Sequence, residues 1–203
     1  MNAGRRYDTP PLPNAETPLE ELCRRLKDSD RAAFEAVFRR FREDLLRYVS
    51  VIVGDDHTAH DLVQDVFVSL WGLRERLVPT KSLRAYLFRM ARNRAYRHLR
   101  DERAHARKHA EMGAEAQAQP PPAHTVDAQH DADVLTKKLH GWIDALPNRQ
   151  REALTLSRFH ELSHYEIAAV MEISPRTVNN HIVRALEHLK GCIQAFEPSL
   201  LES

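Results

Sequence analysis

The stretch SHYEIAAVMEISPRTVNNHIVRALEHLK, residues 163–190, carries the clearest local structural signals in this 203-residue chain. Ser163 is followed three residues later by Glu166, which is the spacing of a capping box at the start of a helix. Ser174 and Pro175 mark a second helix start, because serine caps a helix N-terminus and proline at the first helical position forfeits no hydrogen bond. The stretch therefore predicts two helices separated by a short turn.

The second of these helices is predicted to have one apolar and one polar face. The polar face over its first turns consists of Arg176, Thr177, Asn179, Asn180, His181 and Arg184. A helix fits the major groove of DNA, where asparagine can pair with adenine and arginine with guanine through two hydrogen bonds. The alternative is a helical pair that only packs, with its polar face in solvent. The double capping, the short turn and the Asn/Arg-rich face favour a helix-turn-helix that reads DNA.

The composition of the rest of the chain predicts an all-α protein. Apolar residues make up 42% of the sequence, only six residues are glycine, and few windows alternate with period two. The two cysteines, Cys23 and Cys192, lie far apart without CxxC spacing, which is typical of a reducing compartment. Residues 1–18 are polar and proline-rich, so they predict a flexible tail rather than a signal peptide or membrane span. We therefore expect a cytoplasmic protein.

Two helical blocks are predicted on either side of a linker. Residues 19–110 contain apolar stripes at spacings of three and four. A helix start is predicted at residues 28–30, a helix end followed by a new start at residues 54–56, and a break at residues 79–82 before a long basic helix from about Leu83 to Lys108. Residues 111–131 are rich in Ala, Gln and Pro, which predicts a linker. Residues 132–196 return to helical periodicity, and residues 197–203 are a short tail. The fold prediction is two small helical domains joined by a flexible linker.

Charge is strongly segregated within the first block. Residues 81–108 contain ten Lys/Arg against two acids, a net charge of +8, with Tyr86, Phe88 and Tyr96 interleaved. Such a segment can follow phosphates while its aromatic rings stack on unpaired bases; the alternative is a solvated basic face. The preceding helix has the opposite sign, with Asp55, Asp56, Asp61 and Asp65. Those acids either favour the helix dipole or form a docking face for a basic protein, and the residues alone leave both open.

The helix-turn-helix block is nearly neutral in charge. Residues 146–190 contain six Lys/Arg and five Glu, a net charge of +1. Neutralisation of DNA phosphates by this block alone would be weak. We therefore expect it to need help from another part of the chain or from a partner, which argues against a free-standing repressor.

Other constellations of reactive side chains do not form a convincing site. His57, His60 and Asp61, or His105 and His109, could be drawn as metal ligands, but chance spacing is common among 12 histidines. The sequence contains no evident nucleophile–base arrangement, phosphate-binding glycine loop or catalytic carboxylate pair. We predict no enzyme activity, no metal and no cofactor.

Together these motifs resemble a known family. Residues 31–109 and 135–192 are similar to the two conserved domains, regions 2 and 4, of extracytoplasmic-function (ECF) sigma factors, the smallest members of the sigma-70 family. DLVQDVFVSLW (61–71) resembles the helix that binds core RNA polymerase. SLRAYLFRMARNRAYRHLR (82–100) resembles the segment for −10 recognition and promoter melting. Residues 146–190 resemble the domain that binds the −35 element.

The resemblance implies three sets of functional residues. The core-polymerase-binding set is Asp61, Gln64 and Asp65. The −10 and melting set is Lys81, Ser82, Arg84, Tyr86, Phe88, Arg89, Arg92, Asn93 and Arg97. The −35 set is Arg176, Thr177, Asn179, Asn180, His181 and Arg184. The loop 77–82 would receive a flipped base, whose unstacking costs a few kcal/mol that a pocket must recover.

The resemblance also implies partners and exposes two departures. Core RNA polymerase, promoter DNA and a separate anti-sigma protein are the expected partners, without membrane insertion. Family members commonly have Lys or Arg where Asn179 and His181 stand, and Gly where Glu172 makes the turn. Two alternatives from other classes are a free-standing helix-turn-helix regulator, which would bind a palindromic duplex without polymerase, and a partner-binding protein with no DNA function.

Overall fold

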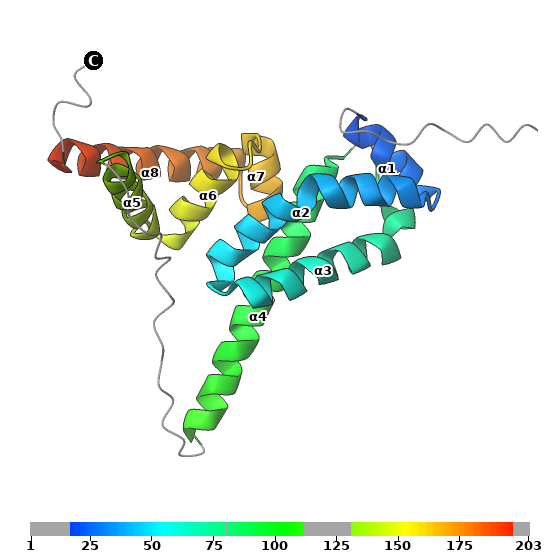
Figure 1. Cartoon of the computed structure of the whole chain (residues 1–203), viewed down its shortest axis with the longest axis horizontal. Coiled ribbons are helices and arrows are strands. Elements are labelled where there is room, and N and C mark those ends of the chain that lie inside the picture. Colours follow the sequence, from blue (N-terminus) through cyan, green and yellow to red (C-terminus); the bar gives the residue numbers. More distant parts are fainter. Residues whose placement is uncertain (1–16, 80, 112–130, 197–203) are drawn as a thin grey trace, which may run out of the picture.

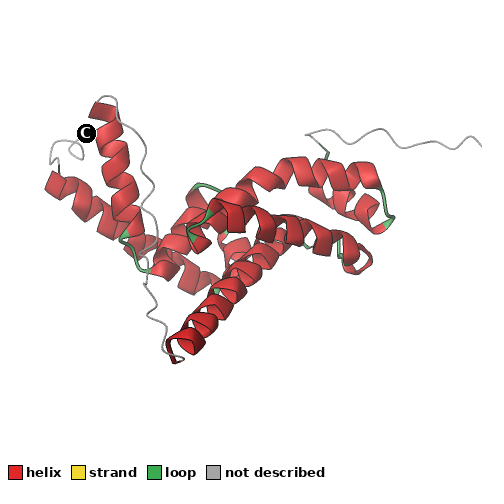
Figure 2. Cartoon of the chain, turned by 60° about the horizontal axis from the view of Figure 1, so that its bottom comes forward, coloured by secondary structure: helices red, strands yellow, loops and turns green. Residues whose placement is uncertain are grey.

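The computed structural model describes residues 17–79, 81–111 and 131–196, and over these ranges the chain forms helices and no strand (Figure 1, Figure 2). The first block consists of α1 (Leu19–Lys27), α2 (Arg31–Val53), α3 (Asp56–Gly72), the short 3-10 turn η1 (Arg74–Arg76) and α4 (Leu83–Glu111). The second block consists of α5 (Asp131–Asp144), α6 (Asn148–Arg158), α7 (His164–Met171) and α8 (Pro175–Phe196). The all-α prediction is confirmed. The predicted tails and the linker lie largely outside the described residues.

Local side-chain chemistry sets the helix boundaries in the first block. The Asp30 carboxylate accepts a hydrogen bond from the backbone N–H of Ala32 at 2.8 Å and starts α2. Gly54 ends α2 in the left-handed conformation, with φ 76°. The Asp55 carboxylate accepts a bond from the backbone N–H of Thr58 at 2.7 Å and starts α3. These predicted boundaries are confirmed, because each depends on neighbours within a few residues.

The core of the first block lies where α2, α3 and α4 pack on one another. Phe41, Leu45, Leu70 and Leu87 are each no more than 1% exposed there. Burying a side chain of this size stabilises the fold by roughly 1.5–3 kcal/mol. The far half of α4 projects away from the other helices, and residues 100–108 are exposed along it (Figure 1).

The two blocks pack against each other. Helix α7 lies against α4, and one apolar cluster runs from the first block into Leu156, Ile167 and Met171 of the second. A smaller cluster joins α5, α6 and α8 around Leu154 and Ala185. The sequence left the mutual arrangement of the blocks open. None of the helices in the described ranges is both long and apolar enough to cross a bilayer.

Candidate polymerase and nucleic-acid interfaces

The helix-turn-helix forms as its sequence predicts. The Ser163 hydroxyl accepts a bond from the backbone N–H of Glu166 at 3.3 Å, and the Glu166 carboxylate accepts one from the Ser163 N–H at 2.9 Å. The turn passes through Glu172, whose φ of 57° is left-handed, the conformation that glycine adopts without strain. The Ser174 hydroxyl then accepts a bond from the backbone N–H of Thr177 at 3.1 Å.

The polar face of α8 is largely open to solvent. Val178, Ile182 and Ala185 are buried against the other helices of the block. Of the six predicted −35 residues, four are exposed and two are half-buried: Arg176, Asn179, Asn180 and Arg184 in the first group, Thr177 and His181 in the second. The face that could enter a major groove is therefore accessible.

The Ser163→Ala substitution is expected to lower the free energy of unfolding by about 1 kcal/mol, because it removes the acceptor for an N–H at the start of α7. Urea denaturation followed by circular dichroism measures this difference. The control is Ser163→Thr, which keeps a capping hydroxyl and should retain most of the stability. An alanine variant as stable as the parent would contradict this function of the capping box.

The acids of α3 separate into two groups. Asp55 caps the helix, and hydrogen bonds from Thr58 lower the pKa of its carboxyl group. Asp61, Gln64 and Asp65 are exposed further along the helix, beside Val68, which is 64% exposed. The Asp65 carboxylate also accepts a hydrogen bond from Arg94 of α4 at 3.0 Å. The helix-dipole explanation therefore accounts for Asp55, whereas the exposed set remains available to a partner.

The predicted −10 residues differ widely in exposure along α4 and the segment before it. The exposed ones are Lys81, Ser82, Arg89, Asn93 and Arg97; the half-buried ones are Arg84 and Tyr86; the buried ones are Phe88 and Arg92. Thr80, in the loop predicted to receive a flipped base, lies outside the described residues. Phe88 is 0% exposed, so in this arrangement its ring cannot stack on a base.

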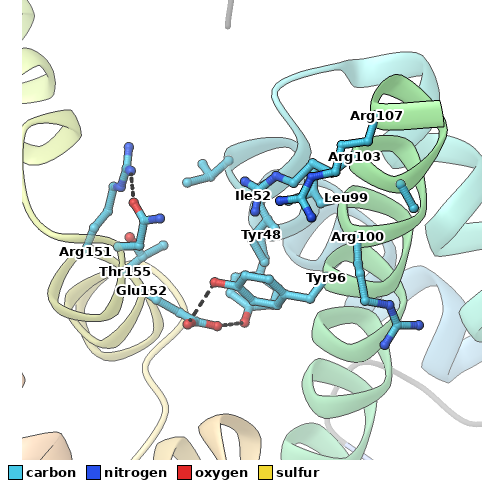
Figure 3. A pocket seen from close by; sticks show the side chains of 13 residues that line it. Tyr48, Ile52, Tyr96, Leu99, Arg100, Arg103, Arg107, Arg151, Glu152 and Thr155 are labelled. Carbon is cyan, nitrogen blue, oxygen red and sulfur yellow. Dashed lines mark hydrogen bonds between the residues drawn. The ribbon is translucent and has the colours of Figure 1, made fainter. Parts of the chain in front are cut away.

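A buried carboxylate joins the two blocks. Glu152 of α6 is 6% exposed and accepts a hydrogen bond from Arg92 at 2.7 Å. It also accepts bonds from the Tyr48 hydroxyl at 2.8 Å and the Tyr96 hydroxyl at 3.2 Å (Figure 3). Burial and the nearby carboxylate raise the pKa of both tyrosines, that of Tyr48 well above its usual value. Burial is the largest influence on the pKa of Arg92 and would lower it, but the hydrogen bond to Glu152, the charge of that carboxylate and the two tyrosines together outweigh burial, so that pKa is raised. The carboxylate is thus held against a guanidinium that stays charged.

A cleft of about 440 Å³ opens beside Glu152, between α2, α4 and α6 (Figure 3). Ile52 and Tyr96 contribute to its lining from the first block, and Thr155 from the second. Arg103 and Arg107 from the projecting half of α4 reach its margin. The margin of the cleft is therefore basic.

Two more carboxylates of the second block contact the first. Glu166 accepts a hydrogen bond from the Ser82 hydroxyl at 2.6 Å, and Glu172 forms an ion pair with Arg89 at 2.9 Å. Burial would raise the pKa of Glu166, but hydrogen bonds from Ser82 and Ser163 lower it. His160 packs between the blocks, and its ring lies 5.0 Å from that of Phe88 and 5.9 Å from that of Tyr48.

Sequence reasoning missed Glu152, Tyr48 and His160. Tyr48 and Glu152 are 104 residues apart in the sequence, and Arg92 and Glu152 are 60 residues apart. No local spacing therefore indicates the cluster. The histidine sets that could be drawn as metal ligands, but were not predicted to be a site, also depend on spacing alone. Within the part of the chain that the structure describes, no three His, Cys, Asp or Glu side chains are placed to hold a metal ion.

Comparison with protein families gives the class of this chain. The model for sigma-70 region 2 matches residues 37–105, and the model for sigma-70 region 4 matches residues 137–189. The two matches together cover more than half of the sequence and coincide with the acidic and basic helices and with the helix-turn-helix. The fold and these matches define a sigma factor of the sigma-70 family.

Relatives narrow the class further. The chain is 25% identical over 183 residues to the ECF RNA polymerase sigma factor SigK of Mycobacterium sp. (strain KMS), covering 90% of this chain and 94% of that protein. It is 28% identical over 159 residues to the ECF RNA polymerase sigma factor SigM of Bacillus subtilis, covering 77% and 93%. The chain belongs to the ECF type of the sigma-70 family.

Solved structures share the fold. CnrH in complex with the cytosolic domain of CnrY matches with a TM-score of 0.62 and 21% identity, over 87% of this chain and 97% of that one. The sigma factor RpoE of Bartonella quintana, in complex with the anti-sigma factor NepR, matches with a TM-score of 0.61 and 21% identity, over 79% and 96%. These likenesses concern the fold alone.

Proposed function

We propose that this chain binds core RNA polymerase and directs it to a specific set of promoters as an alternative sigma factor, acting in the cytoplasm without an enzymatic reaction of its own. The main support for the proposal is that one chain matches both sigma-70 region 2 and sigma-70 region 4. In addition, the polar face of α8, the second helix of the helix-turn-helix, is exposed. A partner that binds region 2 would supply the DNA affinity that region 4 lacks, because the near-neutral region 4 neutralises few phosphates.

Each predicted residue set has a distinct function in this proposal. Asp61, Gln64 and Asp65 dock on a basic surface of the polymerase, where charge complementarity sets orientation and partner choice. The cations and aromatic side chains of α4 hold the opened −10 strand through phosphate contacts and stacking. The polar face of α8 reads the −35 element in the major groove. A separate anti-sigma protein is the expected regulator.

The −35 function is tested by the triple variant Arg176→Ala/Asn179→Ala/Arg184→Ala, whose three positions are exposed and leave the buried face of α8 intact. Each base contact is worth about 1–3 kcal/mol, so we expect at least a ~100-fold loss of initiation at promoters that depend on a −35 element. In vitro transcription with core polymerase on a set of promoter fragments measures the loss.

The matched control is Arg158→Ala/Lys190→Ala, which also removes two positive charges, but from exposed positions of region 4 outside the polar face of α8. It should retain most of the activity. Equal initiation by the triple variant and the control would contradict the −35 assignment. Specific binding of the wild-type chain to a palindromic duplex without polymerase would instead support the free-standing regulator.

A further inference from the structure

The cleft beside Glu152 is a candidate site for a small molecule. It has a volume of about 440 Å³ and is formed by α2 and α4 of the first block and by α6 of the second (Figure 3). Sites for small molecules usually have volumes of about 300–1,000 Å³. No residue of the three predicted functional sets is among those that line this cleft. It is therefore separate from the predicted polymerase and promoter contacts.

Arginines of α4 stand on the cleft side of that helix at helical spacing. Arg100, Arg103 and Arg107 follow Tyr96 at intervals of three and four residues, which places them on one helix face. Arg100 is paired with Asp101, whereas no acid whose side chain the structure describes pairs with Arg103 or Arg107. Like charges four residues apart on a helix repel each other. An anion bound at Arg103 and Arg107 would relieve this repulsion.

A further arginine lines the cleft from the second block. Arg151 of α6 lies on the other side of the cleft from Arg103 and Arg107 (Figure 3). Its guanidinium donates a hydrogen bond to the side chain of Asn148 at 2.9 Å. Its ion pair with Asp144 is longer, at 3.4 Å, and the exposed position of Asp144 leaves that pair screened by water. Guanidinium groups on two helices thus border one space, an arrangement that suits a compact anion with several charges.

The acid in the cleft wall does not cancel these charges. Glu152 is the only acid among the lining residues in the described ranges, and it is buried. Its carboxylate is bonded to the Arg92 guanidinium at 2.7 Å and to two tyrosine hydroxyls, so its charge is balanced within the protein. The other charged residues of the lining are all arginines. A cleft lined by one sign of charge attracts ligands of the opposite sign.

The remaining wall is apolar or uncharged. Ile52, Leu99 and the half-buried ring of Tyr96 contribute to it. Nucleobases stack on aromatic rings and pack against apolar side chains. The Thr155 hydroxyl and the Asn148 amide add hydrogen-bonding groups from α6. The cleft therefore combines a surface for a flat ring with a cationic border for a polyanion.

We propose that this cleft binds a nucleotide that carries at least two phosphates. Arg103 and Arg107 bind the phosphates from α4, and Arg151 binds them from α6, because a guanidinium can donate two parallel hydrogen bonds to one phosphate. The base packs against Tyr96 and the apolar wall. The site takes residues from both blocks, and its occupation uses none of the predicted polymerase or promoter contacts. Nucleotide binding is measured on the free protein, so its outcome is independent of the proposed function.

Calorimetric titration of the full chain with ATP and with GTP tests the site, at about 0.15 M salt so that attraction between distant exposed charges is screened. Inorganic tripolyphosphate, which has the anion without the base, and adenosine, which has the base without the anion, are titrated in parallel. We expect at least one of the two nucleotides to bind one-to-one and at least ~10-fold more tightly than tripolyphosphate, because the base adds stacking to the phosphate contacts. Adenosine should show no saturable binding.

Substitutions on opposite walls of the cleft localise the binding. Arg103→Glu changes α4, and its control Lys108→Glu makes the same charge change at an exposed α4 position outside the lining. Arg151→Glu changes α6, and its control is Arg158→Glu. Each cleft variant should weaken nucleotide binding at least ~10-fold, and each control should stay within about twofold of the wild type. Circular dichroism verifies the helix content; Arg151→Gln replaces the glutamate variant if that variant loses helix.

Three results would overturn the proposal. The first is equal affinity for nucleotide and tripolyphosphate, or no binding of either nucleotide. The second is a loss of affinity in Arg103→Glu without a loss at Arg151, since this would reduce the site to a basic helix face. The third is displacement of the nucleotide by a short single-stranded DNA that also loses affinity in both cleft variants, which would assign the cleft to nucleic acid.

Discussion

Asp61→Lys is expected to weaken binding of this protein to core RNA polymerase by at least ~100-fold. The Asp61 carboxylate is exposed on α3 within the predicted docking face, so its reversal leaves the buried side of the helix intact. Close charge pairs at protein interfaces have coupling energies of about 1.5–7 kcal/mol, and reversal adds repulsion to the lost attraction. Titration of labelled protein with purified core polymerase measures the change in Kd.

The control for this substitution is Glu35→Lys, which makes the same charge change at an exposed position of α2. It should leave the Kd within a few-fold of the wild-type value. Asp65 is less suitable for a reversal, because its carboxylate is bonded to Arg94 and a lysine there would also disturb the contact between α3 and α4. Equal affinity of the Asp61 and Glu35 variants for core polymerase would refute the docking face.

The second large effect concerns His160 and pH. His160 is 2% exposed, and burial lowers its pKa from 6.5 to about 4, against a weaker opposing influence of Asp44. Its Nδ1 atom lies 4.0 Å from the Asp44 carboxylate, which is too far for a hydrogen bond. The positive charges of Arg47 and Arg84 disfavour protonation of the His160 ring. The packed, folded protein therefore favours the neutral ring.

A lowered histidine pKa stabilises the folded state above the unfolded pKa and loses that contribution as pH falls. Above pH 6.5 the contribution of His160 to the free energy of unfolding should not change with pH. Below pH 6.5 the free energy of unfolding should decrease by about 1.4 kcal/mol per pH unit, and the total decrease by pH 4 should be at most about 3 kcal/mol. Urea denaturation at pH 7.5, 6.5, 5.5 and 5.0 measures the slope. His160→Phe, which keeps a ring against Tyr48 and Phe88, should show a shallower slope. Parallel curves for both proteins would contradict this function of His160.

Local features of the fold could be predicted from the sequence, because their causes are local. Asp30, Asp55 and Ser163 each satisfy a backbone N–H two or three residues away, and the structure confirms all three helix starts. The buried and polar faces of α8 follow from the same short-range spacing. These interactions do not depend on where the rest of the chain lies.

The contact between the regions could not be predicted, because it depends on residues far apart in sequence. Glu152 looked like an ordinary acid in a near-neutral block, and only the fold brings it to Arg92 and Tyr48. Phe88 illustrates a second difficulty. An aromatic residue among cations can indicate base stacking, but spacings of three and four also define a buried helical stripe, and in this arrangement Phe88 is in the core. Its proposed contact with DNA therefore requires that region 4 moves.

Promoter-dependent initiation in vitro is the direct test of whether this protein gives core RNA polymerase its promoter specificity. Purified core RNA polymerase is assayed on a set of promoter fragments with and without this protein, and run-off transcripts are quantified. A subset of fragments should gain initiation only when the protein is present, and Asp61→Lys should abolish the gain. A folded protein that binds core polymerase but gives no initiation on any fragment would contradict the assignment as a promoter-specificity factor.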